Sequence, residues 1–150
     1  EFGHMIVEPD GLPCPCGNHG CLEQYISEPA VLSYYAAQKN TLYSPTMEDL
    51  VSSYINKEPA AVNTIVRFTK YLSCGINNLW NLFCPECIIL NSQLITYLPE
   101  ILTMTEELLP KRFQKHCILK ASALQDTAVL LGGARICISN FLGIEKLVIT

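Results

Sequence analysis

The sequence predicts an α/β fold in which helices dominate and three short strands lie at residues 5–7, 87–90 and 117–120. Between Pro59 and about Phe83, apolar residues recur every three or four positions. That spacing is typical of a long helix buried along one side. Short apolar runs beside turn residues elsewhere in the chain are typical of strands. Together these patterns favour one domain built mainly of helices.

The chain begins with the predicted strand at 5–7, which ends at the turn residues Pro9, Asp10 and Gly11. A helix is expected to start at Cys21 or Leu22 and to run to Ser27. Ser27 then caps a second helix, because a serine hydroxyl accepts a backbone N–H and proline is tolerated in a first turn. This second helix is expected to fade near Asn40.

Thr46 and Asp49 resemble a capping box, with aspartate in the usual place of glutamate, and predict a helix to about Ile55. Pro59 opens the longest helix, which is expected to reach Phe83. Its apolar residues form one stripe and predict a buried side rather than a cofactor site. The stripe consists of Val62, Ile65, Thr69, Leu72, Ile76, Leu79 and Phe83.

The second half of the chain predicts two further strands, two further helices and a shorter helical stretch. In order, they are a buried strand at 87–90, a helix at 99–109 stopped by Pro110, a helical stretch including 113–115, a strand at 117–120, a helix at 127–142 ended by Gly143, and an apolar tail at 144–150. Neither an internal repeat nor a low-complexity segment is found.

A cysteine-rich loop is the strongest chemical signal. Cys14, Cys16 and Cys21 fall within eight residues, with two glycines between them that allow sharp turns. A tetrahedral zinc needs a fourth ligand, and His4 lies ten residues upstream of Cys14. We therefore predict a structural zinc bound by His4, Cys14, Cys16 and Cys21. Residues 4–23 are called the metal loop below.

Two other readings of these cysteines are a disulfide and free buried thiols. One residue between Cys14 and Cys16 is too little for an unstrained disulfide, and three is an odd number. A second cysteine pair, Cys84 and Cys87, has Cys-x-x-Cys spacing, but only two cysteines are present and a strand follows at once. The five cysteines outside the metal loop are interpreted as reduced core residues of a cytoplasmic protein. They are Cys74, Cys84, Cys87, Cys117 and Cys137.

Composition excludes several classes of function. Hydrophobic residues make up 49 % and charged residues 16 % of the 150 residues, against about 25 % charged residues in an average domain. The net charge is −4 and no basic run is present, so this segment is not expected to bind nucleic acid by itself. No apolar run reaches the roughly 18 residues that a membrane-spanning helix needs. The apolar content favours an extensive partner surface or a missing piece of the fold.

The motif Glu1-Phe2-Gly3-His4-Met5, followed by Cys-x-Cys-Gly-Asn-x-Gly-Cys-Leu-Glu from Cys14, resembles the ROK family. That family unites bacterial sugar kinases with sugar-responsive repressors of the NagC, Mlc and XylR type. The resemblance covers residues 1–150 and implies the C-terminal part of a two-lobed, actin-like (ribonuclease H-like) fold. This C-terminal part comprises the metal loop and, at residues 24–150, a remainder of helices and αβ structure.

The resemblance also implies a sugar site. In the kinases of the family, a glutamate, the zinc-bound histidine and a second glutamate hold sugar hydroxyls, and these positions match Glu1, His4 and Glu23. The imidazole would donate through the ring nitrogen that the metal leaves free. The catalytic aspartate and phosphate loop of the kinases, and the DNA-binding helix-turn-helix of the repressors, are expected upstream of residue 1. We therefore expect no kinase activity and no DNA binding from these residues alone.

Three functions follow as alternatives: the sugar-sensing and oligomerisation domain of a repressor, the C-terminal lobe of a sugar kinase, and a plain zinc-stabilised oligomerisation piece. ATP-using members place glycines after the strand at 87–90, where this chain has Asn91-Ser92-Gln93-Leu94. Side chains there would crowd a phosphate, which favours the repressor. Gly132-Gly133-Ala134 matches a turn near the adenine in kinases, which we interpret as serving close helix packing. The expected partners are a sugar or sugar phosphate and a second copy of the chain.

Overall fold

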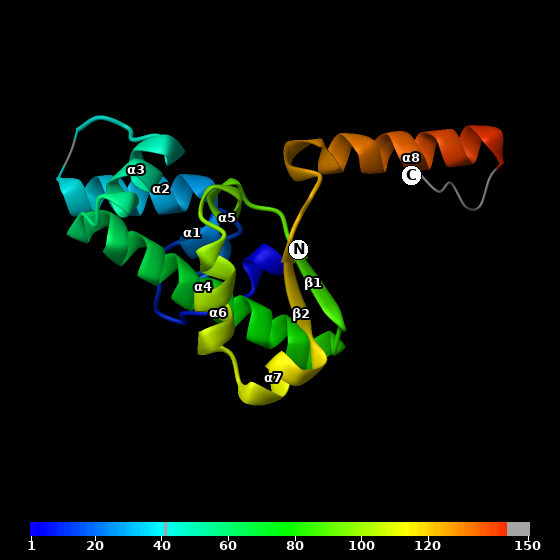
Figure 1. The fold of residues 1–150 in the computed structure, drawn as a ribbon, viewed down its shortest axis with the longest axis horizontal. Coiled ribbons are helices and arrows are strands. Elements are labelled where there is room, and N and C mark those ends of the chain that lie inside the picture. The colour runs from blue at the N-terminus through cyan, green and yellow to red at the C-terminus, as the bar shows by residue number, and fades with distance from the viewer. Residues whose placement is uncertain (41, 144–150) are drawn as a thin grey trace.

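The structure is a computed structural model that describes residues 1–40 and 42–143 (Figure 1). Helices dominate, as predicted. In chain order, the elements are η1 Phe2–His4, α1 Glu23–Ile26, α2 Glu28–Lys39, α3 Met47–Ile55, α4 Pro59–Phe83, β1 Cys87–Leu90, α5 Gln93–Tyr97, α6 Glu100–Leu108, α7 Lys111–His116, β2 Ile118–Ala121, η2 Gln125–Thr127 and α8 Ala128–Leu142. The predicted tail at 144–150 lies outside the described residues.

The long helix α4 is the centre of the body. Helices α1, α2, α3 and α6 pack against it, and Figure 1 shows it running diagonally between them. Ile65, Leu72 and Ile76 of the predicted stripe are buried, and buried Thr69 turns its hydroxyl back to the carbonyl of Ile65. The stripe does not extend to Phe83, whose side chain is 71 % exposed. The α4 stripe is therefore core over most of its length and offers little surface to a partner.

Two helix starts follow the predicted capping chemistry. The hydroxyl of Ser27 accepts a hydrogen bond from the backbone N–H of Ala30 at 3.4 Å, at the start of α2. Thr46 and Asp49 form the capping box of α3: the N–H of Asp49 donates to the Thr46 hydroxyl, and the N–H of Thr46 donates to the Asp49 carboxylate. These local bonds satisfy N–H groups that a helix start leaves without partners.

Strands β1 and β2 form a parallel two-stranded sheet, with Cys87 opposite Ile118. The prediction for 87–90 is confirmed, and the one for 117–120 is shifted by one residue. The expectation that the strand at 87–90 is buried is wrong for most of its residues. Ile88 is buried, but Ile89 is 66 % exposed, because within the described residues the second face of this sheet carries no covering element.

The predicted strand at 5–7 is not formed. Ile6 makes only an isolated antiparallel bridge with Cys21. The pairing stops there because Gly20 turns the chain with a positive φ of 71° on one side, and α1 begins at Glu23 on the other. What the sequence presents as a strand is therefore one arm of the metal loop.

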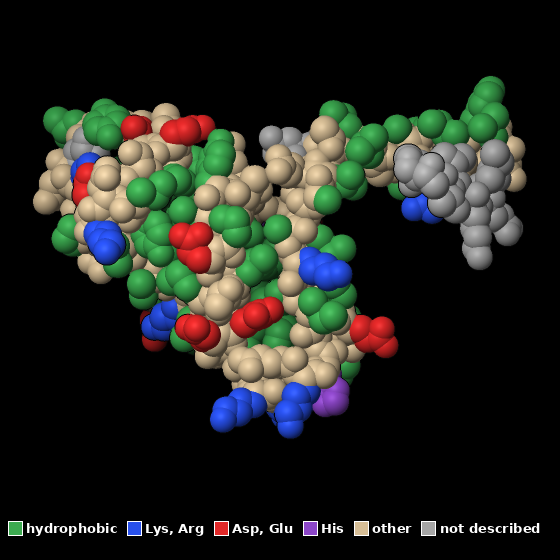
Figure 2. Space-filling view, in the orientation of Figure 1, with side chains coloured by type: hydrophobic (Ala, Val, Ile, Leu, Met, Phe, Trp, Pro, Cys, Tyr) green, Lys and Arg blue, Asp and Glu red, His purple; other side chains and the backbone are tan. Residues whose placement is uncertain are grey.

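Helix α8 stands apart from the body, at the upper right of Figure 1, and no residue of it is buried. Its glycines do not serve close packing as predicted, since a Cβ atom at Gly132 or Gly133 would meet nothing within 4 Å. Figure 2 shows hydrophobic side chains along this helix. Val129, Leu130 and Phe141 are 82 %, 75 % and 89 % exposed. Among the described residues, α8 is the largest apolar element without a covering partner.

The interpretation of the other five cysteines as core residues is confirmed for one of them. Cys117 is buried, Cys74 is half-buried, and the remaining three are exposed at Cys84, Cys87 and Cys137. All five are free thiols. The prediction fails for the exposed three because the apolar segments around them, at the end of α4, in β1 and in α8, are themselves open to solvent.

Helix α5 is not among the elements that the sequence predicts. None of the described helices has the length and apolar character needed to cross a membrane.

Candidate functional site

The metal loop is closed by hydrogen bonds between its two arms. The backbone N–H groups of Val7 and Glu8 both donate to the carbonyl of Gly20, at 2.9 and 3.3 Å. A side chain at position 20 would overlap the carbonyl oxygen of Glu8, and the positive φ there also favours glycine. The closure brings the N-terminal arm, which carries His4, over the cysteines.

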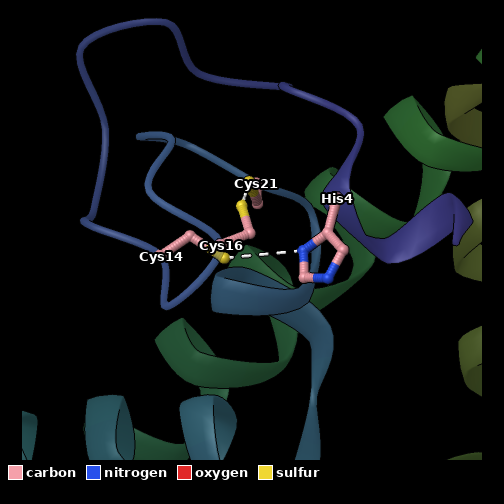
Figure 3. Close-up of side chains that lie close together, drawn as sticks. All are labelled: His4, Cys14, Cys16 and Cys21. Atoms are coloured by element: carbon pink, nitrogen blue, oxygen red, sulfur yellow. Dashed lines mark hydrogen bonds between the residues drawn. The ribbon is translucent and has the colours of Figure 1, made fainter.

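The four predicted metal ligands converge on one point (Figure 3). The ligand atoms of His4, Cys14, Cys16 and Cys21 all lie within 4.8 Å of one another. The Nδ1 atom of His4 is 3.6 Å from the Sγ of Cys14, and the Sγ atoms of Cys16 and Cys21 are also 3.6 Å apart. A tetrahedral zinc with bonds of about 2.3 Å to sulfur holds its sulfurs about 3.8 Å apart. These residues therefore fit a zinc ion in both chemistry and spacing.

Without a nearby cation, burial disfavours the charged thiolate form of the cysteines in this cluster. Cys14 and Cys21 are buried, whereas Cys16 is exposed. Burial, together with the neighbouring sulfurs, raises the pKa of Cys21 to about 12. A hydrogen bond from the backbone of Asn18 lowers the pKa of Cys16. Three sulfurs this close cannot all ionise unless a positive charge compensates them, and a divalent ion supplies that charge.

Helix α1 positions the loop from below through two residues that sequence reasoning did not single out. The side-chain amide of Gln24 donates to the Sγ of Cys14 at 3.6 Å. The hydroxyl of Tyr25 accepts the backbone N–H of Leu12 at 3.0 Å. In the sequence, only the position of these two residues directly after Glu23 could have indicated that they contact the metal loop. Second-layer contacts of this kind orient metal ligands.

The three predicted sugar-binding residues lie together beside the metal cluster. A carboxylate oxygen of Glu23 is 3.7 Å from Nδ1 of His4, and one of Glu1 is 3.9 Å from its Nε2. Because Nδ1 also faces Cys14, it is the nitrogen placed to bind metal, and Nε2 is left to face outward beside Glu1. The sequence alone does not determine which ring nitrogen of His4 faces the metal cluster and which faces outward. Both carboxylates are accessible, with side chains 91 % exposed at Glu1 and 49 % at Glu23.

A cluster of three tyrosines surrounds Arg67 of α4, next to the metal loop. The guanidinium carbon lies 4.2 Å from the ring centre of Tyr34, 4.8 Å from that of Tyr25 and 5.3 Å from that of Tyr71. Tyr25 and Tyr71 stack with ring centres 4.0 Å apart. We call these four residues the Arg67 cluster. From the sequence pattern, Arg67 could be assigned only to the side of the helix away from the apolar stripe. The spacing of Arg67 and Tyr71 by one helical turn was the signal that could have indicated their contact.

A family model described as the ROK family matches residues 1–140. The chain belongs to the ROK family. This ROK chain is 32 % identical to a xylose repressor of Bacillus spizizenii, over 98 % of the chain and 38 % of the repressor. It is 30 % identical to a glucokinase of Streptomyces coelicolor, over 63 % of the chain and 34 % of the kinase.

Solved structures of the ROK family share the fold. A glucokinase from Streptomyces griseus, in complex with glucose and AMPPNP, superposes with a TM-score of 0.79 at 25 % identity, over 91 % of this chain and 50 % of that one. A transcriptional regulator described as a homologue of the E. coli MLC protein gives a TM-score of 0.66 at 28 % identity, over 81 % of this chain and 34 % of the regulator. The chain thus spans less than two fifths of the curated repressor and half or less of these solved chains.

Proposed function

We propose that this chain is the sugar-sensing part of a ROK-family transcriptional regulator, whose DNA-binding part precedes it. The body is the C-terminal portion of an actin-like lobe, and sugar is read by Glu1, His4 and Glu23. The observation that carries the choice of regulator over kinase is the turn after β1.

Residues 91–94, which form that turn and the start of α5, all carry side chains, and two of these side chains have structural contacts of their own. The side-chain amide of Asn91 donates to the carbonyl of Gln125 at 3.1 Å, and the side chain of Leu94 is buried. A phosphate bound by backbone N–H groups needs a turn that it can approach closely, which side chains on Cβ atoms obstruct. The match to xylose repressors along almost the whole chain supports the same choice.

In this proposal, a structural zinc is held by His4, Cys14, Cys16 and Cys21. When bound, it supplies positive charge and a fixed tautomer, and its four protein ligands leave no position for a reactive water. Gln24 orients Cys14, and the carbonyl of Gly20 joins the two arms of the loop. The residues of the loop thereby hold Glu23 and His4 in one arrangement.

The chemistry of sugar recognition follows from three side chains. Nε2–H of His4 donates to a sugar oxygen, and the carboxylates of Glu1 and Glu23 accept hydroxyl protons in charge-assisted hydrogen bonds. The two carboxylates are exposed and the imidazole is half-buried, so the three side chains form a shelf rather than an enclosed pocket. We expect tight binding only in the longer protein, and weak or absent sugar binding to residues 1–150.

The test uses the longer protein that contains this chain. We expect a sugar, neutral or phosphorylated, to change its affinity for operator DNA, with no transfer of phosphate from ATP to the sugar. The Glu23→Gln variant should lose the sugar response and keep its zinc. Glu28→Gln, at an exposed glutamate five residues further on at the start of α2, is the matched control and should respond normally. ATP-dependent phosphorylation of a sugar at an ordinary enzymatic rate would overturn the regulator proposal.

The C-terminal lobe of a ROK sugar kinase is the second candidate. Its specific support is the glucokinase superposition, which has a higher TM-score than that of the regulator. A kinase would additionally need the aspartate and phosphate loop that we expect upstream. The phosphorylation assay above separates the two candidates directly.

A further inference from the structure

The guanidinium of Arg67 is held by aromatic faces alone. Among the described residues, no carboxylate forms an ion pair with it, and no hydrogen bond joins it to another side chain or to the backbone. The nearby acidic side chain of Glu8 instead accepts from the hydroxyl of Tyr71 at 3.3 Å. A guanidinium stacked on rings leaves its N–H donors free at its edges.

These free donors border a cavity. Arg67 lines a space of about 550 Å³, together with the first turns of α2 and residues of α1. Its other walls include Tyr34, Ser33, Ala37 and Glu23. Glu23 is turned toward His4, since a carboxylate oxygen lies 3.7 Å from Nδ1 of that ring. Arg67 is therefore the cation of this cavity, and Glu23 connects the cavity to the proposed sugar site.

The start of α2 adds little capacity to bind an anion. The N–H of Ala30 is already bonded to the Ser27 hydroxyl, and that of Val31 to the Ser27 carbonyl. Pro29 has no N–H at all. The residues that line the cavity include one cation, Arg67, whose planar fork matches the paired oxygens of a phosphate or carboxylate.

We propose that the cavity beside Arg67 binds the phosphate or carboxylate group of a small molecule whose hydroxyls are held at Glu23. This deepens the proposed sugar-sensing function and makes the effector an anionic sugar, either a sugar phosphate or a sugar acid. The fixed tyrosine rings keep the guanidinium in place before the ligand arrives, so little side-chain entropy is lost on binding.

The test titrates the longer protein that contains this chain, loaded with zinc, with inorganic phosphate and then with glucose 6-phosphate and gluconate, following phosphorus NMR and calorimetry. We expect saturable binding, weakened about tenfold or more by Arg67→Gln. Arg67→Lys should keep the charge and the ring contacts but bind more weakly, because it lacks the fork. A preference for glucose 6-phosphate or for gluconate identifies which anion the cavity takes.

Two further variants separate binding from folding. Ala37→Phe should fill the cavity and abolish binding without touching the guanidinium. Lys70→Gln, which removes an exposed cation 5.7 Å from the Tyr71 ring and outside the cavity, should bind as the unaltered chain does. An Arg67 that serves stability alone would lower the unfolding midpoint in Arg67→Gln and leave phosphate affinity unchanged, which overturns the proposal.

Absence of saturable binding, or equal weakening by Lys70→Gln, would also overturn it. The proposed sugar function has a separate readout, namely the change in operator binding by the longer protein in response to any sugar, neutral or anionic. Phosphate binding without a sugar response would count against the function alone. A response to neutral sugar without phosphate binding would count against the anion site alone.

Discussion

Nδ1 of His4 lies 3.6 Å from the Sγ of Cys14, although ten residues separate them in the chain. The two arms of the metal loop are joined by hydrogen bonds of the backbone, so the imidazole reaches the cysteines before any metal is considered. A preformed set of ligands binds metal more tightly than one that must be ordered, because less conformational entropy is lost.

One zinc per chain is therefore the first prediction, with three sulfurs at about 2.3 Å and one nitrogen at about 2.0–2.1 Å by X-ray absorption. Cys16→Ser should lose the metal and loosen the loop that carries Glu23. Cys137→Ser, on the exposed face of α8, is the matched control and should keep full zinc by elemental analysis. Full zinc in Cys16→Ser would refute the ligand set.

A second prediction compares two glycines of the loop. Gly17 and Gly20 both have positive φ, at 92° and 71°. Gly17→Ala meets open space and should cost only the backbone strain, about 1–2 kcal/mol. Gly20→Ala also collides with the carbonyl of Glu8 and should cost clearly more in urea unfolding, with weakened zinc binding. Equal costs for the two variants would show that the loop closes differently.

The third prediction concerns acid. The backbone N–H of Thr46 holds the pKa of Asp49 below its usual value, with help from the Thr46 hydroxyl. A carboxylate with a lowered pKa in the folded state stabilises above its unfolded pKa of about 4, and that contribution is lost as the pH falls further. Asp49→Asn should therefore unfold at a lower temperature than the unaltered chain near pH 6, and the difference should shrink near pH 2–3.

Asp10→Asn, on the exposed turn before the cysteines, controls for the general effect of removing a carboxylate. Metal loss at low pH affects the unaltered chain and the Asp49→Asn variant alike, so it cancels in their difference. A difference that stays constant across this pH range would mean that the capping box does not contribute through its charge.

The fourth prediction is association. We expect residues 1–150 to form a homodimer or a strand-exchanged assembly, because large exposed apolar faces and open sheet edges recruit partners. Since the α4 stripe is mostly core, α8 and the open face of β1 and β2 are the surfaces to test. The double substitution Leu130→Lys and Phe141→Lys should yield a monomer in light scattering, whereas Leu42→Lys, at an exposed leucine between α2 and α3, should not.

A mass that stays monomeric at every concentration, together with no binding of an apolar dye, would contradict the exposed-face argument. A dimer that persists in the α8 double variant would instead assign the contact to the sheet. Neither result bears on the metal site, which lies in a different part of the body.

The sequence was sufficient wherever the deciding interactions are local. Pro59 and the three-and-four spacing defined both ends of α4, and Thr46 with Asp49 defined the start of α3, because each signal lies within a few residues of the element that it specifies. The convergence of the four candidate metal ligands could be predicted for the same reason: three cysteines at close spacing in a short loop leave few arrangements.

Prediction failed where long-range packing decides the outcome. Residues 5–7 have the composition of a strand, but their partner segment is limited by Gly20 and by α1. The Arg67 cluster joins residues from three helices, so no local pattern announced it. Apolar α8 resembles a buried helix in composition, and only the structure shows that the described body does not cover it.

A single residue, Ser27, separates α1 from α2, and it has an extended backbone with φ −67° and ψ 150°. Glu23 thus lies at the far end of α1, a helix of one turn whose direction relative to α2 depends on the two backbone torsion angles of Ser27. A ligand that shifts α1 through Glu23 either rotates α2 with it or changes the torsion angles of Ser27 and breaks the serine cap at the start of α2. Effector binding can therefore be followed at Ala30, whose amide hydrogen would exchange faster if the cap opened and as slowly as before if α2 moved intact.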